Sequence, residues 1–320
     1  MYKVPFTQSV GEHSPRRAIP KTPTKNDLSQ APHQRLPDWI KVTGTHGPDY
    51  ARVKTMLKQH GLHSVCQEAA CPNIRECFDE GTATFMILGN RCTRGCNFCN
   101  VIKAKPLGLD EEEPARLASV VAQLKLKQVV ITSVTRDDLP DGGASIFART
   151  IELLRQQDKD VKVEFLIPDF RGNMEALRLV LESGVDVLAH NVETVGRLYK
   201  QVRPGMKLDR SLEILRFSSD YIPRPVVKSG FMVGMGETID EIIELLHQIH
   251  ATGTDIVTIG QYLRPSLHHL PVERFYHPEE FKELARIGME IGFAHVESGP
   301  LVRSSYKAFN QSKRLLESKC

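Results

Sequence analysis

The chain has 320 residues, of which 41% are hydrophobic and 25% charged, and its formal net charge is +3. This length and apolar fraction are sufficient for a large buried core, which excludes collagen-like, disordered and small disulfide-rich proteins. Lysine and arginine are spread along the chain beside nearly as many carboxylates, so the weak positive charge does not indicate a nucleic-acid-binding protein.

The N-terminal part of the chain differs in composition from the rest. Residues 1–35 are rich in proline and basic residues, and we expect them to form a flexible arm. Residues 36–82 form an N-terminal extension, with a short helical pattern within 46–60. Neither a signal sequence nor a membrane-spanning segment is visible, which predicts a cytoplasmic protein.

From residue 83 onward, short apolar strands alternate with longer helical patterns. The predicted strands are 83–89, 128–134, 162–168, 185–191, 226–234 and 256–263. The predicted helices are 114–126, 144–157, 173–183, 208–219, 238–252 and 278–291. Six such units predict an α/β fold, a parallel (β/α)6 partial TIM barrel over 83–292, followed by a C-terminal extension over 293–320. In such barrels the chemistry lies at the carboxyl ends of the strands.

Six of the seven cysteines lie in two triplets, a pattern that favours metal ligation in a reducing compartment over disulfides. The second triplet, Cys92, Cys96 and Cys99, directly follows the first strand, and its short spacing lets three thiolates reach one centre. A four-iron cluster needs one ligand per iron, so three thiolates leave one iron open to a substrate. The alternative is a zinc site completed by a distant histidine, such as His63 or His190.

The first triplet is Cys66, Cys71 and Cys77, which lies before the first strand and so in the N-terminal extension. One centre shared by all six cysteines is an alternative, but two centres of three cysteines each is the simpler assignment. A zinc ion that stabilises the fold of the extension also fits this spacing.

The C-x3-C-x2-C spacing with the aromatic Phe98 resembles the signature of the radical S-adenosylmethionine superfamily. Together with the first triplet, the setting GTATFMILGNRCTRGCNFCNV and the R-S-S-Y run at 303–306, the chain is similar to the lipoyl synthase family from about residue 36 to 306. The resemblance implies an enzyme that inserts two sulfur atoms at C6 and C8 of a protein-bound octanoyl-lysine, giving lipoyl-lysine.

By this resemblance, the second triplet holds the 4Fe-4S cluster that cleaves S-adenosylmethionine, and two molecules of this co-substrate are used per product. The first triplet holds an auxiliary 4Fe-4S cluster that donates sulfur. The resemblance implies Ser305 as the fourth ligand of this cluster, with Ser304 as the second choice. On the sequence alone Cys320 is a rival ligand, and the two serines could instead make ordinary loop hydrogen bonds. The implied partners are octanoylated carrier domains (E2 subunits of 2-oxoacid dehydrogenases and the glycine cleavage H protein), an electron donor such as flavodoxin or ferredoxin, and an iron–sulfur cluster carrier.

Other strand ends carry residues that the resemblance places around S-adenosylmethionine. Ser133 is expected at its methionyl end, Asn191 and Glu193 at its ribose, and Arg203 and Lys228 at its carboxylate. The remaining expected contacts, near the adenine or the substrate, are Gly230, Gly234, Gln261 and Tyr262. The alternatives are close backbone approach for the glycines, barrel packing for Tyr262, and helix capping for Asp137 and Asp138.

Two other functions compete with this interpretation. A biotin-synthase-like enzyme or a methylthiotransferase keeps the radical chemistry, although a methylthiotransferase usually carries extra domains and the sequence after residue 306 is short for one. A non-catalytic two-cluster electron carrier would need four cysteines per cluster.

Overall fold

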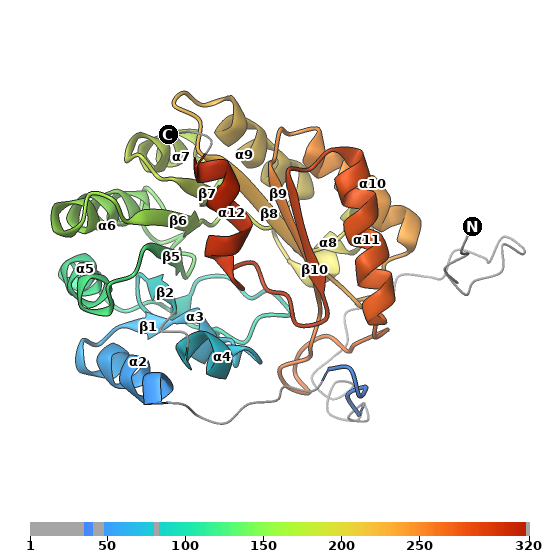
Figure 1. Cartoon of the computed structure of the whole chain (residues 1–320), viewed down its shortest axis with the longest axis horizontal. Coiled ribbons are helices and arrows are strands. Elements are labelled where there is room, and N and C mark those ends of the chain that lie inside the picture. Colours follow the sequence, from blue (N-terminus) through green and yellow to red (C-terminus); the bar gives the residue numbers. More distant parts are fainter. Residues whose placement is uncertain (1–34, 41–47, 80–82, 318–320) are drawn as a thin grey trace, which may run out of the picture.

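Seven parallel strands form the centre of the molecule in a computed structural model that describes residues 35–40, 48–79 and 83–317. They belong to one eight-stranded sheet in the order β1-β2-β5-β6-β7-β8-β9-β10, in which only β1 is antiparallel to its neighbour. In Figure 1 the strands follow an arc with helices along its outer side. The sheet has two edges, β1 and β10, so the predicted partial barrel is confirmed as an open one.

All six predicted strands are confirmed, and each is nearly continuously buried because helices cover one face and the barrel interior the other. They are β2 (Thr84–Ile87), β5 (Gln128–Ser133), β6 (Lys162–Leu166), β7 (Val187–Ala189), β8 (Val226–Val233) and β9 (Ile256–Gln261). The structure adds β1 (His63–Ser64), the parallel strand β10 (His295–Gly299), and a small separate sheet of β3 (Arg91–Cys92) and β4 (Ile102–Lys103).

The predicted barrel helices are also confirmed, and the caps explain where several begin. In the barrel they are α5 (Glu113–Leu124), α6 (Ala144–Gln157), α7 (Met174–Glu182), α9 (Leu208–Asp220), α10 (Ile239–His250) and α11 (Pro278–Ile291). Thr238 caps α10 in a reciprocal capping box with Glu241, and Asn173 accepts two amide hydrogen bonds at the start of α7.

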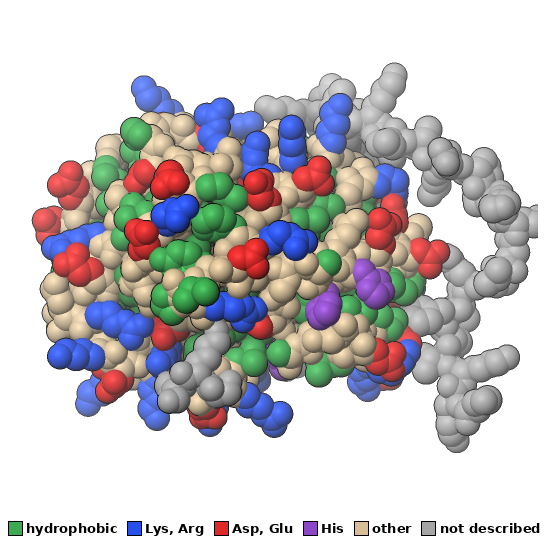
Figure 2. Space-filling view, turned by 90° about the horizontal axis from the view of Figure 1, so that it is seen from above, with side chains coloured by type: hydrophobic (Ala, Val, Ile, Leu, Met, Phe, Trp, Pro, Cys, Tyr) green, Lys and Arg blue, Asp and Glu red, His purple; other side chains and the backbone are tan. Residues whose placement is uncertain are grey.

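Shorter helices and turns connect these units or lie in the extensions. They are α2 (Pro48–Gln59), α3 (Val65–Glu68), α4 (Ile74–Asp79), α8 (Tyr199–Val202), the 3-10 turns η1 (Phe170–Gly172) and η2 (Gly196–Leu198), and α12 (Ala308–Glu317). None of the helices in the described ranges is long and apolar enough to cross a membrane. Acidic and basic side chains are interspersed on the face in Figure 2, in keeping with the small net charge.

The C-terminal helix α12 closes the amino end of the barrel. Leu316 packs with Val187, Val226 and Ile256, the first residues of β7, β8 and β9. The hydroxyl of Ser312 also donates to the side chain of Gln128, the first residue of β5. Helix α12 therefore crosses the centre of the arc in Figure 1, at the end opposite to the carboxyl ends of the strands.

The segment between β10 and α12 joins the C-terminal extension to the N-terminal one. The amide of Asn73 donates to the Leu301 carbonyl at 2.7 Å, and Thr84 Oγ1 donates to Ser305 Oγ at 2.8 Å. The phenol of Tyr306 donates to Glu76 on α4. These contacts join parts of the chain more than 200 residues apart and bring the R-S-S-Y run beside the first cysteine triplet.

Candidate active site

The loop that carries the second cysteine triplet begins with a sharp turn directly after β2. Leu88 and Gly89 both have positive φ angles (67° and 82°), and the turn leads the chain out of the sheet and into β3. The carboxylate of the buried Glu113 accepts a hydrogen bond from the Leu88 amide at 2.6 Å and so supports this turn. The predicted position of the triplet at the carboxyl end of the first barrel strand is confirmed.

Backbone hydrogen bonds hold this loop against three other segments. The Thr93 amide donates to the Thr135 carbonyl, the Asn97 amide to that of Val202, and the Leu270 amide to that of Asn97. His269 adds a contact from its Nε2 to the Cys99 carbonyl at 3.1 Å. The loop is therefore ordered by bonds to segments that follow β5, β7 and β9.

The three thiols of the second triplet lie close together, so that Cys92 acts on the ionisation of both Cys96 and Cys99. Burial raises the pKa of Cys99 to about 12, and the Cys96 and Cys92 thiols add to this rise. Burial also raises the pKa of Cys96 to about 11, although the charge of Arg203 opposes it. Binding of a metal to Cys96 and Cys99 must therefore displace a proton from each thiol. The Cys92 sulfur accepts backbone N–H groups of Arg94 and Thr135, each at 3.4 Å.

Several predicted contacts around this triplet are buried polar atoms without a hydrogen-bond partner among the described residues. They are Ser133 Oγ at the end of β5, Asn191 Oδ1 after β7, and Arg203 Nε after α8. Seven buried side-chain atoms lack a partner among the described residues, and these three belong to predicted cofactor contacts, which is consistent with a site for a polar ligand. Arg203 donates from Nη1 to the Asn191 carbonyl at 3.0 Å and so connects two of these positions.

Glu193 lies at the same end of the sheet, where it forms a parallel bridge with Phe231 of β8. Its φ angle is 70°, in the left-handed region that a non-glycine residue seldom adopts. Burial raises the pKa of Glu193, while the charge of Arg203 lowers it in part. The thiols, the carboxylate and the three unpartnered atoms together fit an iron–sulfur cluster with a polar co-ligand.

The aromatic residue of the motif, Phe98, is partly buried and packs against the apolar cluster built around β8 and β9. It anchors the loop to the barrel by apolar contact.

The zinc alternative finds little support in His190. Its Nδ1 contacts the Ile167 carbonyl and its Nε2 contacts the Ser211 hydroxyl, both at 3.0 Å, so both ring nitrogens are engaged. Burial, together with the charge of Arg203, lowers the pKa of His190 to about 4. In the described ranges, no three His, Cys, Asp or Glu side chains are arranged to hold a single metal ion.

Lys228 is not placed as the sequence predicted. Its ammonium group forms a buried ion pair with Glu164 on β6 at 2.8 Å, and both side chains are only 1% exposed. The lysine sits early in β8, toward the middle of the barrel, and its charge is already neutralised. This ion pair argues against the expectation that Lys228 meets the cofactor carboxylate.

Gln261 and Tyr262 are both fully buried and bonded within the protein. The Gln261 amide donates to the carbonyls of Tyr262 and Arg274, and its oxygen accepts the Tyr276 amide. The Tyr262 phenol donates to the Leu270 carbonyl at 2.8 Å. Their side chains hold the segment after β9 to the sheet, which supports the alternative of packing.

Gly230 in β8 and Gly234 directly after it are required by close approach within the protein. A Cβ on Gly230 would lie 2.3 Å from Thr258 Oγ1, and one on Gly234 would lie 2.5 Å from the Arg274 carbonyl. Gly234 also has a φ of 105°. The alternative of close backbone approach thus accounts for both, and neither observation demonstrates contact with a ligand.

Asp137 and Asp138 do not cap the helix that follows. They pair with Arg94 and Arg136, and the carboxylate of Asp141 accepts the amides at the start of α6 instead.

The first triplet lies in a second group of residues at the seam between the two extensions. Burial raises the pKa of Cys66 to about 11, and that of Cys71 is also raised by burial. Cys71 adds to the rise in the pKa of Cys66, and the charge of Arg303 partly lowers the pKa of Cys71. Cys77 lies nearby on α4 and is partly buried.

Ser305 is tied to this triplet through Thr84. The Thr84 hydroxyl bonds to Ser305 Oγ at 2.8 Å and also hydrogen-bonds to Cys66. The predicted serine is therefore brought beside the predicted cysteines. Cys320, the rival ligand, lies outside the described residues.

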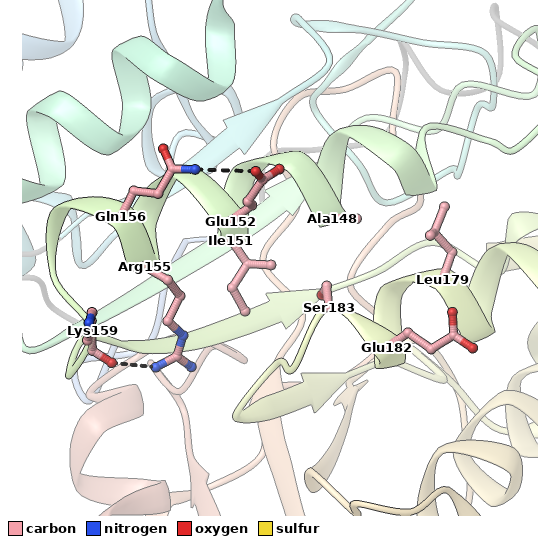
Figure 3. Close-up of a pocket in the computed structure, with 9 residues that line it drawn as sticks. All are labelled: Ala148, Ile151, Glu152, Arg155, Gln156, Lys159, Leu179, Glu182 and Ser183. Atoms are coloured by element: carbon pink, nitrogen blue, oxygen red, sulfur yellow. Dashed lines mark hydrogen bonds between the residues drawn. The ribbon is translucent and has the colours of Figure 1, made fainter.

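An open groove of about 600 Å³ lies elsewhere, between α6 and α7 on the outer layer of helices (Figure 3). None of the predicted site residues lines it. Its walls are formed by residues from these two helices and their ends: Ala148, Ile151, Glu152, Arg155, Gln156, Lys159, Leu179, Glu182 and Ser183.

Sequence reasoning overlooked Thr84 and Arg94. Arg94 stands between two predicted ligands and binds Asp137 and Asp169, which follow β5 and β6. A charged residue inside the cysteine motif, with aspartates at two strand ends, was a usable signal. Nothing in the sequence marks Thr84, because its contact lies 221 residues away.

Comparison with known proteins places the chain among relatives over most of its length. Residues 86–249 match the profile of the Radical SAM superfamily, and residues 9–71 match the N-terminal domain of lipoyl synthase of the Radical_SAM family. A lipoyl synthase of Rubrobacter xylanophilus is 51% identical over 277 residues, 87% of this chain and 86% of that protein. A lipoyl synthase of Methylococcus capsulatus is 54% identical over 279 residues, 87% of each chain.

Among solved structures, Streptococcus suis SuiB bound to precursor peptide SuiA is similar with a TM-score of 0.54 and 11% sequence identity. The match covers 83% of this chain and 55% of that one. At this identity the similarity concerns the fold.

Proposed function

The chain belongs to the lipoyl synthase family of the radical SAM superfamily, and from this premise we propose how its residues share the work of the reaction. It is an enzyme that uses a 4Fe-4S cluster and S-adenosylmethionine to insert two sulfur atoms, at C6 and C8, into the octanoyl chain of a carrier-protein lysine. The chemistry demands a radical, because no side-chain acid or base removes hydrogen from an unactivated C–H bond.

Cys92, Cys96 and Cys99 hold the radical-forming cluster in this proposal. When bound, this cluster supplies the electron that cleaves S-adenosylmethionine to methionine and the 5′-deoxyadenosyl radical. The observation that carries the assignment is the set of buried, unpartnered polar atoms around the thiols, on Ser133, Asn191 and Arg203.

The protein's own contribution is to bind and orient the co-substrate and to exclude water. We assign the Ser133 hydroxyl and the Arg203 guanidinium to the methionyl end. The Asn191 amide and the Glu193 carboxylate are assigned to the ribose hydroxyls. The partial burial of these groups limits the access of solvent to the bound co-substrate.

Cys66, Cys71 and Cys77 hold the auxiliary cluster, which we propose as the sulfur donor, with Ser305 as its fourth ligand. A serine oxygen is a poorer match for iron than a thiolate, and a weak ligand suits an iron that must leave when the cluster is dismantled. The link from Ser305 through Thr84 to Cys66 supports this choice over Ser304. Residues 36–82 and 293–317 would then act together as the unit that holds this cluster.

The substrate is an octanoylated carrier protein. We propose that the carriers are the E2 subunits of 2-oxoacid dehydrogenases and the glycine cleavage H protein. Flavodoxin or ferredoxin would supply electrons, and a cluster carrier would rebuild the auxiliary centre. Six reduced thiols in two triplets are consistent with a cytoplasmic location.

Anaerobic reconstitution with iron and sulfide counting tests the assignment, followed by mass spectrometry of an octanoylated carrier peptide. We expect about eight irons per chain, and a peptide that gains two sulfur atoms and loses two hydrogens. About four irons with cleavage of S-adenosylmethionine but no sulfur transfer would contradict the auxiliary centre. Absence of 5′-deoxyadenosine would instead support an electron carrier.

Two matched pairs of variants separate the roles within the auxiliary site. Cys66→Ala should abolish lipoyl formation yet retain cleavage of S-adenosylmethionine, whereas Cys320→Ala should retain both. Ser305→Ala should slow lipoyl formation and lower the iron content, whereas Ser304→Ala should not. Equal effects of the two serine variants would contradict the choice of Ser305.

A further inference from the structure

Arg94 lies inside the second cysteine loop, between Cys92 and Cys96, and its side chain is largely buried. Its guanidinium binds Asp137 through two parallel bonds, each of 2.7 Å. Its third nitrogen lies 2.5 Å from an oxygen of Asp169. Such fork-to-carboxylate geometry fixes orientation as well as distance, which a lysine cannot reproduce.

The two aspartates anchor the loop to different strands of the barrel. Asp137 follows β5, and its backbone amide also donates to the hydroxyl of Thr93 in the loop. Asp169 follows β6 and is only 1% exposed, and its second oxygen accepts Arg210 of α9 at 3.1 Å. The Arg94 side chain is 11% exposed. Hydrogen bonds and ion pairs therefore connect the loop to the ends of β5 and β6 and, through Asp169, to α9.

The charges in this network cancel. Two aspartates face two arginines, Arg94 and Arg210, so the group offers no net positive charge to nearby thiolates. An electrostatic role toward the cluster would need an excess of positive charge. What remains is a geometric role, because the network fixes the path of the chain between the first two ligands.

We propose that Arg94 is a positioning residue that keeps the Cys92–Cys99 loop in its ligand-ready shape before the cluster binds. This inference rests on the proposed role of the three cysteines. A loop that is already ordered does not have to lose conformational entropy when the cluster is assembled, and this favours fast and complete loading. Without these hydrogen bonds and ion pairs, the same thiols would be present but would sample many arrangements.

Hydrogen exchange on the cluster-free full-length chain tests this directly. The variants are Arg94→Gln, which removes the charge and the paired bonds to Asp137, and Arg94→Lys, which keeps only the charge. Arg155→Gln is the matched control. Arg155 also pairs with an aspartate, Asp186, at 2.7 Å, but it lies on α6 and far from the cysteines in the sequence. Exchange is read in a peptide covering 92–99 and in one covering α7.

We expect Arg94→Gln to raise the exchange rate of the 92–99 peptide about tenfold, equal to about 1.4 kcal/mol, and to leave the α7 peptide unchanged. Arg94→Lys should restore only part of the protection, and Arg155→Gln should not alter the loop. Cluster loading, followed by absorbance, should be slower in the Gln variant by a similar factor. Unchanged exchange of the loop, or a rise of equal size in both peptides, would overturn the inference.

The cluster content of the wild-type chain separates this inference from the proposed function. If the wild-type loop binds no four-iron cluster, the assignment of the cysteines fails regardless of the exchange data. If it loads normally and Arg94→Gln exchanges like the wild type, only the positioning role of Arg94 fails.

Discussion

Replacing Lys228 by methionine tests whether this residue serves the fold or the cofactor. The lysine and Glu164 are both 1% exposed, and their charged atoms lie 2.8 Å apart. At an effective dielectric constant of about 20, their attraction is roughly 6 kcal/mol, most of which offsets the cost of removing both charges from water. The pair thus contributes little net stability, but each charge depends on the other.

The single variant Lys228→Met leaves Glu164 buried and unpaired, so we expect it to lower the free energy of unfolding by about 3–5 kcal/mol. For a domain of this size, that lowers the melting temperature by on the order of 10 °C. The double variant Lys228→Met/Glu164→Met removes both charges and should recover most of this loss. Thermal unfolding of the cluster-free chain, followed by circular dichroism, measures both effects.

Binding of S-adenosylmethionine to the reconstituted double variant completes the test. Because the lysine charge is already neutralised by Glu164, we expect the dissociation constant to stay within about twofold of the wild-type value, well under 1 kcal/mol. A Lys228→Met variant of wild-type stability that fails to bind the co-substrate would refute the reasoning and restore Lys228 as a cofactor cation.

Three further predictions follow from single contacts. Gly234→Ala should lower the free energy of unfolding by about 2 kcal/mol or more in urea titrations, because the new Cβ would lie 2.5 Å from the Arg274 carbonyl at a φ of 105°; wild-type stability would contradict this packing. Thr84→Val removes the hydrogen bond to Ser305, so we expect the auxiliary cluster to be lost roughly fivefold faster, measured by counting iron over time. Cleavage of S-adenosylmethionine should be retained. Loss of the cluster at the wild-type rate would argue against a role for the Thr84–Ser305 bond. Burial raises the pKa of Asp169, but the charge and hydrogen bond of Arg94, the amide of Arg171 and the ring of His190 together lower it from 3.8 to about 2. This contribution to stability, roughly 2 kcal/mol, is present above pH 4 and should be lost as the pH falls toward 2, and Asp169→Asn should abolish that part of the acid dependence.

Most of the barrel could be predicted because its strands are buried on both faces and read as continuous apolar runs. Strand β10 is less distinct: the run 293–299 resembles a strand, but its half-buried residues include Glu297 and Ser298, so it was not counted as a barrel strand. Strand β1 has two residues, too few for any periodicity. Edge strands of this kind are set by pairing with a distant neighbour, which a local pattern does not contain.

The site was predictable where spacing along the chain determines proximity, as it does for the cysteines of one short loop. It was not predictable where the partner lies far away in the sequence. A lysine in an apolar strand suggested a ligand, yet its partner is Glu164, 64 residues distant. The bonds of Gln261 to the segment at 274–276 could not be predicted for the same reason.

The origin of the inserted sulfur tests the account most directly. The enzyme is reconstituted with heavy-isotope sulfide, freed of unbound sulfide, and allowed a single turnover on an octanoylated carrier peptide in the presence of unlabelled sulfide. We predict that both sulfur atoms of the lipoyl product carry the heavy isotope, and that Cys66→Ala forms no product. Product containing only unlabelled sulfur, or labelled product from Cys66→Ala, would contradict the assignment of Cys66, Cys71 and Cys77 to a sulfur-donating cluster.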